Sequence, residues 1–224
     1  MSLHAVFFDL DDTLCDTIGT RKARAQRAFQ ALAGERPDLD GDEFVARVME
    51  PTGDRVVHGV PALVEDLCLG GSEAGRAAIG AWFFDGCMEL LRAFEGVAET
   101  VDRLRGDYTL GVITNGEGKL QRAKWLRLGL GIELMVISGE CGFEKPDPRI
   151  FTHACSLAGV APREAVFVGD RLDVDIAGAK TTGMRAVWFN HWSGVMDGAR
   201  PAPDAVIERF PELVDVLRLL AAPH

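Results

Sequence analysis

The sequence has few cysteines, and their spacing does not suggest pairing. The five cysteines are scattered along the chain without any closely spaced pair, at Cys15, Cys68, Cys87, Cys141 and Cys155. An odd number at such spacing argues against both a disulfide framework and a zinc site. We therefore expect a protein of a reducing compartment, which we take to be the cytoplasm.

The sequence also lacks a long apolar run and an excess of basic residues. No stretch approaches the roughly 18 residues of a membrane span. The first predicted strand begins at Ala5, so we expect no signal peptide ahead of the fold. The 34 acidic residues outnumber the 24 basic ones, for a formal net charge of -10. This balance argues against nucleic acid or an anionic membrane as a partner.

The chain opens with a short apolar run that ends in carboxylates. Residues 5–8 read AVFF, and Asp9, Asp11 and Asp12 follow. An uninterrupted apolar run is typical of a strand buried on both faces, and ligands bind at the carboxyl ends of strands in open α/β sheets. Neighbouring carboxylates repel one another unless a cation or a phosphoryl site compensates. We therefore expect a metal-assisted site at the end of this strand.

No strand signal follows until residue 109. Helices are expected over residues 17–32, 43–50, 61–69, 73–94 and 97–104. Beyond them, strands alternate with helices, with strands expected at 109–114, 134–138, 165–168, 186–189 and 205–207. The helices between and after these strands are expected at 119–128, 148–158, 173–182 and 211–220. Such alternation predicts βαβ units and a parallel sheet.

The predicted fold class is therefore α/β. We expect a Rossmann-like parallel sheet core, flanked by helices, with an inserted all-α subdomain. The 224 residues suffice for a core and a small second domain. The core is assigned to residues 1–15 and 95–224, and the helical insertion to residues 16–94.

Polar residues recur where the other predicted strands end. Thr114 and Asn115 follow the second strand, Lys145 lies in the loop after the third, and Asp170 and Asp175 follow the fourth. In a parallel sheet these strand ends share one edge. An aspartate can attack phosphorus, a second carboxylate can transfer a proton, and a lysine, a hydroxyl and an oxygen-bound Mg²⁺ can hold the charged oxygens. The set therefore favours phosphoryl transfer.

Four segments of the chain resemble, in order, the motifs of the haloacid dehalogenase superfamily. The segment Asp9-Leu10-Asp11-Asp12-Thr13 matches the first motif, DxDx[TV], and Thr114 matches the Thr or Ser of the second. Lys145 matches the lysine of the third. Gly169-Asp170 together with Asp175 matches the fourth, GDxxxxD. The resemblance covers essentially the whole chain.

The resemblance implies a Mg²⁺-dependent phosphatase acting on a small soluble phosphomonoester, a sugar phosphate or a nucleotide. Asp9 would be the nucleophile, forming an aspartyl-phosphate, and Asp11 the general acid and base. Thr114 would hydrogen-bond the phosphoryl group, and Lys145 would neutralise its charge.

The remaining assignments from the resemblance concern the metal and the phosphoryl oxygens. Mg²⁺ would be held by Asp9, the backbone carbonyl of Asp11, Asp170 and, in the outer part of the site, Asp175. Backbone amides of Asn115 and Gly116 would help to hold the phosphoryl group.

Asp173 and Asp12 have simpler interpretations. We predict that Asp173 N-caps the helix that follows, with metal ligation as the open alternative to Asp175. Asp12 is expected to stabilise its own turn. Trp82, Trp125 and Trp188 are expected in the core.

Members of the superfamily with a helical insertion after the first motif use it as a cap over the site, and residues 16–94 fit that class. CDT before a basic helix, ITNG and EKPDPRIF give a weaker likeness to N-acylneuraminate-9-phosphatase and nucleotidase-type phosphatases. Arg21 lies on the apolar face of its predicted helix, where a charged side chain either reaches solvent or faces a polar cavity. We hypothesise that Arg21 binds an anionic part of the substrate.

Three alternatives to a phosphatase stay open. A phosphomutase of the same superfamily would use the same residues and return the phosphoryl group to its substrate. A 2-haloacid dehalogenase attacks carbon without a metal. The resemblance implies that such enzymes have an aromatic residue at the position where this chain has Asp11. A non-catalytic binding module would usually lack a motif residue, and none is missing here. The oligomeric state is open as well.

Overall fold

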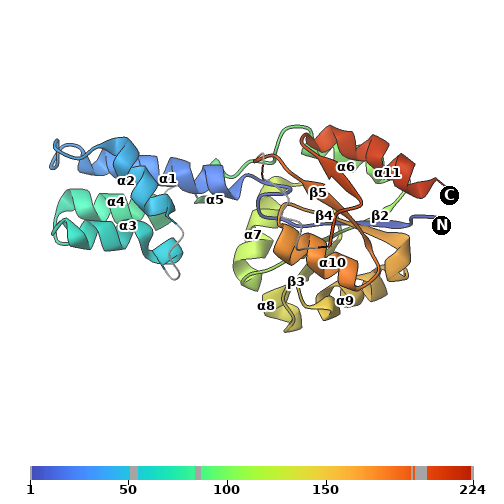
Figure 1. Ribbon diagram of the computed structural model, residues 1–224. Coiled ribbons are helices and arrows are strands. Elements are labelled where there is room, and N and C mark those ends of the chain that lie inside the picture. The colour runs from blue at the N-terminus through green and yellow to red at the C-terminus, as the bar shows by residue number, and fades with distance from the viewer. Residues whose placement is uncertain (1, 51–54, 84–86, 193, 195–200, 223–224) are drawn as a thin grey trace. The chain divides into compact units, whose positions relative to one another are not determined.

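The strands of the protein are short apolar runs that form one parallel sheet. The computed structural model describes residues 2–50, 55–83, 87–192, 194 and 201–222 (Figure 1). The strands are β1 (Ala5–Phe8), β2 (Thr109–Thr114), β3 (Leu134–Ile137), β4 (Ala165–Gly169), β5 (Arg185–Phe189) and β6 (Ala205–Ile207). Their order is β3-β2-β1-β4-β5-β6, and every neighbouring pair is parallel. The central strands β1 and β4 are buried throughout, as expected for strands covered on both faces. The predicted fold class is confirmed.

The register brings the carboxyl ends of the central strands to one edge. Phe8 of β1 pairs with Val112 of β2 and with Val168 of β4. The amide of Asp9 then donates to the carbonyl of Val168 over 2.9 Å, which continues this pairing beyond β1. The residues that follow β1, β2 and β4 therefore meet at the same edge of the sheet.

Helices cover both faces of the sheet (Figure 1). They are α6 (Val97–Leu104), α7 (Gly118–Leu128), α8 (Ser138–Cys141), α9 (Pro148–Ala158), α10 (Ala177–Thr181) and α11 (Leu213–Ala221). On one face α6 contacts α11, and on the other α9 contacts α10. Phe151 of α9 packs edge-on against Phe167 of β4, with ring centroids 5.1 Å apart, in a buried cluster that includes Phe7. This apolar packing holds the sheet edge in place.

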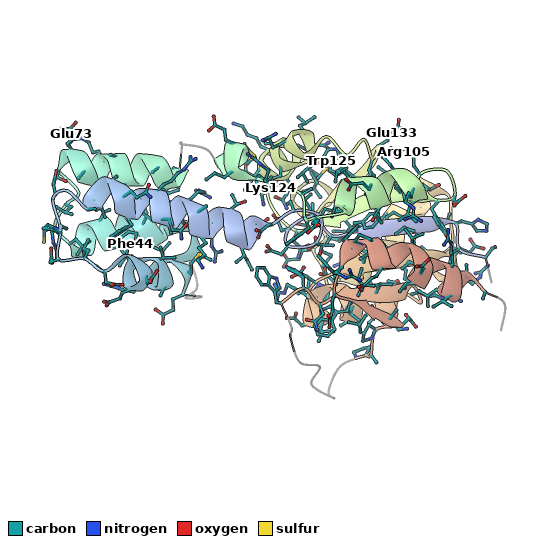
Figure 2. All side chains as sticks on the ribbon, turned by 90° about the horizontal axis from the view of Figure 1, so that it is seen from above. Phe44, Glu73, Arg105, Lys124, Trp125 and Glu133 are labelled. Atoms are coloured by element: carbon teal, nitrogen blue, oxygen red, sulfur yellow. The ribbon has the colours of Figure 1, made fainter. Side chains whose placement is uncertain are left out.

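In the part of the chain that the structure describes, five helices form a second compact unit. They are α1 (Thr17–Leu32), α2 (Gly41–Met49), α3 (Arg55–Asp66), α4 (Glu73–Phe83) and α5 (Cys87–Leu90). The chain divides into Met1–Asp16 with Ala93–His224, and Thr17–Arg92. Within the helical unit α1 packs against α2 and α4, and Phe44, labelled in Figure 2, belongs with Trp82 to its buried core. The side chain of Asp40 caps α2 by accepting from the amide of Glu43 over 2.8 Å.

Two helices of this unit differ from the predicted ones. α3 begins at Arg55, so Pro61 lies inside the helix and not at its start. The helix expected over residues 73–94 is wrong in length, because α4 ends at Phe83 and α5 ends at Leu90, with residues 84–86 outside the described part of the chain. Phe94 has left the helix because its amide donates to the carbonyl of Leu14 over 3.2 Å.

Smaller differences concern the sheet unit. The strand expected to end at Ser138 ends at Ile137, and Ser138 instead begins the short helix α8. Trp82 and Trp188 are buried as predicted, whereas Trp125 is partly exposed, which contradicts the prediction that it is a core residue. Among the described residues, no helix combines the length and the apolar character that crossing a membrane requires.

Candidate active site

Lys145 joins the ends of two strands through a pair of buried contacts. Its Nζ atom lies 2.6 Å from Oδ1 of Asp9 and 2.7 Å from Oδ1 of Asp175. All three residues are buried. Burial by itself lowers the pKa of Lys145, but the negative charges of Asp175 and Asp9 outweigh it and raise the pKa. Lys145 is therefore a charged group in the site.

Asp9, Asp170 and Asp175 form an acidic cluster. Each offers a carboxylate oxygen, and these oxygens lie within 4.8 Å of one another. Burial raises the pKa of Asp9 to about 7, against the opposing charge of Lys145. Burial, with the charges of Asp175 and Asp9, raises the pKa of Asp170 to about 8. Since a cation would replace the protons that these raised pKa values favour, the cluster is compatible with a divalent metal ion.

The turn after β4 brings Asp175 into the cluster and leaves Asp173 outside it. The amides of Asp175 and Ile176 both donate to the carbonyl of Arg171, which gives a widened helical turn. The amide of Arg171 in turn donates to Oδ2 of Asp175 over 3.1 Å. Asp173 is exposed and pairs with the Arg171 side chain. The prediction that Asp173 N-caps a helix is wrong, because the turn begins before it.

Three neighbours determine the positions of Asp175 and Asp170. A Cβ atom on Gly169 would lie 2.5 Å from Oδ2 of Asp175, so only glycine leaves room for this carboxylate. The hydroxyl of buried Thr13 donates to Oδ1 of Asp170 over 3.2 Å. The indole Nε1 of Trp188 donates to the carbonyl of Asp170 over 2.7 Å. Gly169 and Thr13 belong to the motifs that the sequence contains, whereas Trp188 was predicted only as a core residue.

The residues after β2 contact the loop that carries Lys145. The side-chain amide of Asn115 donates to the carbonyl of Lys145 over 2.9 Å, and its Oδ1 accepts from the amide of Lys145 over 2.8 Å. This reciprocal pair positions Lys145. The amide of Gly116 donates to Oγ of Ser138 over 2.9 Å, so it is engaged by the protein itself. Thr114 is buried, and its hydroxyl accepts from Nε2 of Gln121 over 2.6 Å.

Two residues of α7 contact Asp11, and neither was predicted as a site residue. Nζ of Lys124 lies 2.6 Å from Oδ1 of Asp11, and Nε2 of Gln121 donates to Oδ2 of Asp11 over 2.7 Å. Figure 2 labels Lys124 and its neighbour Trp125 on this helix. The available signal was the spacing of Gln121 and Lys124, one helical turn apart, in a helix without a continuous apolar face.

Asp12 belongs to the turn between β1 and α1. Its backbone has φ 57°, in the left-handed region, and its amide donates to the carbonyl of Cys15 over 2.8 Å. The amides of Leu14 and Cys15 both donate to the carbonyl of Leu10. The chain thus folds back after Asp11, in agreement with the structural role expected for Asp12.

A cavity of about 210 Å³ opens among these groups. It is lined by Asp9, Asp11, Asp12, Thr114, Asn115, Lys145, Asp170, Arg171, Val174 and Asp175. The structure thus brings the predicted residues of the four strand ends together around one cavity. Arg21 lies on α1 in the helical unit, where it is partly buried.

Comparison with known proteins identifies the family to which this chain belongs. The haloacid dehalogenase-like hydrolase family matches residues 3–183. The chain is 34% identical to the glyceraldehyde 3-phosphate phosphatase of Methanopyrus kandleri, covering 98% of this chain and 99% of the relative. It is 30% identical to the N-acylneuraminate-9-phosphatase of Rattus norvegicus, and the match covers 96% of this chain and 94% of that relative. A phosphoserine phosphatase of Thermus thermophilus is 45% identical, and the match covers 83% of this chain and 88% of that relative. These matches confirm the resemblance to the haloacid dehalogenase superfamily and the likeness to N-acylneuraminate-9-phosphatase.

A solved structure shares the fold over the full chain. The 2-haloacid dehalogenase from Pseudomonas syringae pv. Tomato DC3000 is 29% identical, with a TM-score of 0.66. The match covers 98% of this chain and 100% of that chain. The combination of sheet and inserted helices therefore occurs in a protein named as a dehalogenase.

Proposed function

This chain belongs to the haloacid dehalogenase-like hydrolase family and is a phosphoric monoester hydrolase, and we propose that it hydrolyses a small soluble phosphomonoester through a phospho-aspartate at Asp9. The observation that carries the proposal is the contact of Lys145 with Asp9 and Asp175 at 2.6 Å and 2.7 Å, on the wall of the cavity. A buried lysine beside a carboxylate can neutralise the charge of an arriving phosphoryl group.

In the proposed reaction Asp9 is the nucleophile and Asp11 transfers the protons. A carboxylate oxygen of Asp9 forms a bond to phosphorus while the bond from phosphorus to the ester oxygen breaks. Asp11 gives a proton to the leaving oxygen. A water then attacks the phospho-aspartate, Asp11 takes a proton from that water, and inorganic phosphate leaves as Asp9 is regenerated.

The phosphoryl oxygens would be held by Thr114, Lys145 and the amides of Asn115 and Gly116. Thr114 and Lys145 line the cavity, and both are buried, so their interactions with a charged group are poorly screened by water. The Gly116 amide would exchange Ser138 for a phosphoryl oxygen. Asn115 has the additional role of fixing the loop of Lys145.

We propose Mg²⁺ as the metal. The donors available are oxygens only, which suits Mg²⁺ better than a softer ion. Asp9, Asp170 and the backbone carbonyl of Asp11 would hold it, with Asp175 in the outer part of the site. When bound, the ion would neutralise negative charge that builds up on the phosphoryl oxygens.

The substrate class is proposed from the relatives. A phosphorylated triose, a phosphorylated sugar acid and phosphoserine appear in their names, and all three are small phosphomonoesters. A sugar phosphate is the leading candidate and a nucleotide the second. The helical unit Thr17–Arg92 is the proposed cap, with Arg21 as a contact for an anionic part of the substrate. The proposed compartment is the cytoplasm, because Cys68, Cys141 and Cys155 carry free thiols.

A 2-haloacid dehalogenase is the second candidate, favoured by the matched solved structure. Asp11 argues against it, since this position would be aromatic by the resemblance. The acidic cluster adds a second argument, because an attack on carbon needs no metal. Release of chloride from 2-chloropropionate would identify this activity.

The test is release of inorganic phosphate from p-nitrophenyl phosphate and from a panel of sugar phosphates, nucleotides and phosphoserine. We expect release that needs Mg²⁺, stops with EDTA and is lost in Asp9→Asn. Asp175→Asn should also impair release, whereas its matched control, Asp173→Asn, should retain it, because Asp173 is exposed outside the cluster.

No release across the whole panel would overturn the proposal. Conversion of a sugar phosphate into its isomer without release of phosphate would identify a phosphomutase instead. Release that persists in Asp9→Asn would exclude a phospho-aspartate at this position.

A further inference from the structure

Helix α7 turns two polar side chains toward the sheet. Gln121 and Lys124 are its buried residues, while Leu126 is 78% exposed on the same helix. Burying a lysine costs free energy unless a partner compensates, whereas burying a leucine is favourable. The orientation of α7 therefore follows from its polar contacts and not from an apolar face.

Those contacts engage both carboxylate oxygens of Asp11. Lys124 holds Oδ1 at 2.6 Å, and Gln121 donates to Oδ2 over 2.7 Å. Two donors on two different oxygens set both the position and the plane of the carboxylate. The same Nε2 of Gln121 lies 2.6 Å from the hydroxyl of Thr114. Asp11 and Thr114 are thus tied to each other through α7.

Gly116 makes room for this arrangement. A Cβ atom at this position would lie 3.1 Å from Cγ and Cδ of Gln121, closer than ordinary contact. The side chain of Gln121 therefore occupies space that any other residue at position 116 would restrict. Neither Gln121 nor Lys124 is among the residues that line the cavity in the described part of the chain. Their contacts reach the cavity through Asp11 and Thr114.

We infer that Lys124, together with Gln121, is a positioning residue for Asp11 in proton transfer to the leaving oxygen. The inference deepens the proposed function and rests on it. Proton transfer requires the carboxylate within hydrogen-bond reach of the leaving oxygen, and small displacements have large effects on rate. Without Lys124, rotation of the Asp11 side chain would move its proton away from that oxygen.

The test compares two leaving groups in Lys124→Met. An alkyl phosphate, the best sugar phosphate of the panel, needs a proton on its leaving oxygen, whereas p-nitrophenolate leaves without one. We expect kcat for the alkyl phosphate to fall on the order of 100-fold, with KM unchanged. For p-nitrophenyl phosphate we expect the rate of the first turnover, in which p-nitrophenolate leaves before water attacks the phospho-aspartate, to change within about threefold. Lys124→Arg should restore part of the loss, and Lys119→Met, an exposed lysine of the same helix, should change neither.

An equal loss in kcat for the alkyl phosphate and in the first-turnover rate for p-nitrophenyl phosphate, or no loss in either, would overturn the inference. The first result would mean that Lys124 acts on the whole site through the fold, and the second that Asp11 needs no support. If Lys124→Met does not fold, Lys124→Gln and Gln121→Leu provide the same comparison of leaving groups. Absence of release by the wild-type enzyme from every phosphate would instead remove the proposed function, and this inference with it.

Discussion

The two sides of the site hold their lysines in different ways. On the α9 side, the Lys145 side chain is 2% exposed between Asp9 and Asp175, and α9 begins soon after it with an apolar buried face. On the α7 side, Lys124 is 10% exposed, and Asp11, its partner, is 27% exposed. Both helices have 11 residues. The difference therefore lies in which face turns inward, and not in helix length.

Helices α9 and α7 contribute differently to the stability of the fold and to catalysis. α9 is held by burial of Phe151 and its neighbours, which favours folding whether or not the site functions. α7 is held by hydrogen bonds to Asp11 and Thr114, which contribute less to folding and more to the geometry of the site. Variants of the apolar face of α9 should therefore alter the free energy of unfolding, and variants of the buried face of α7 should alter turnover.

The largest effect is expected for Lys145→Met. It leaves two buried carboxylates without their cation, so the free energy of unfolding should fall by roughly 3–5 kcal/mol. Phosphate release should fall on the order of 1000-fold. Urea unfolding and a phosphate assay measure the two. Lys180→Met is the control, because Lys180 and Asp204 are each 28% exposed and such surface pairs contribute at most about 1 kcal/mol. Equal losses in both variants would contradict the assignment of Lys145 to the site.

Phe151→Ala should reduce stability without impairing chemistry. Phe151 is fully buried, and its removal should lower the free energy of unfolding by about 3–5 kcal/mol. Because Phe151 does not line the cavity, kcat measured well below the midpoint of thermal unfolding should stay at the wild-type value. Leu157→Ala, in the exposed part of α9, is the matched control, with an expected change within about 0.5 kcal/mol. A loss of kcat in folded Phe151→Ala would show that the packing of α9 affects turnover as well as stability.

The metal-free protein should become less stable as pH rises. The pKa values of Asp9 and Asp170 are raised to about 7 and about 8 in the folded state, against about 4 in an unfolded chain. The stability from their protonated forms is complete below about pH 4 and is lost as pH rises through 7 to 8. Urea midpoints measured in EDTA at pH 5, 6.5 and 8.5 should therefore decrease, and Asp170→Asn should flatten the trend. Midpoints that rise over this range would contradict it.

The smallest effect is expected for Leu126→Gln on α7. Leu126 is exposed, so its replacement should change the free energy of unfolding by no more than about 0.5 kcal/mol. Turnover should also be unchanged, in contrast to Lys124→Met two residues earlier in the helix. Thermal unfolding and the phosphate assay measure both quantities. A large loss of stability would show that the outer face of α7 is covered in solution.

Most of the sheet and much of the candidate site were predictable from local patterns. The apolar runs of β1, β2 and β4 indicated buried parallel strands, and the polar residues that follow them met at one edge because parallel strands share a direction. The helix at residues 73–94 was predicted too long, because the apolar periodicity continued up to the point where Phe94 bonds to Leu14. That bond joins residues about 80 positions apart in the chain, so the local apolar periodicity does not reveal it.

The sequence alone thus determined the parallel sheet, the helical insertion and the residues at the strand ends, because apolar periodicity and strand direction are local properties. The tertiary structure decided which groups meet. A widened turn turned Asp175 inward and left Asp173 in solvent, although both are aspartates of the same segment. Lys124 became a buried partner of Asp11 because the fold placed a carboxylate opposite it. A polar residue is buried only where a partner compensates its loss of water, and the position of that partner is a property of the whole chain.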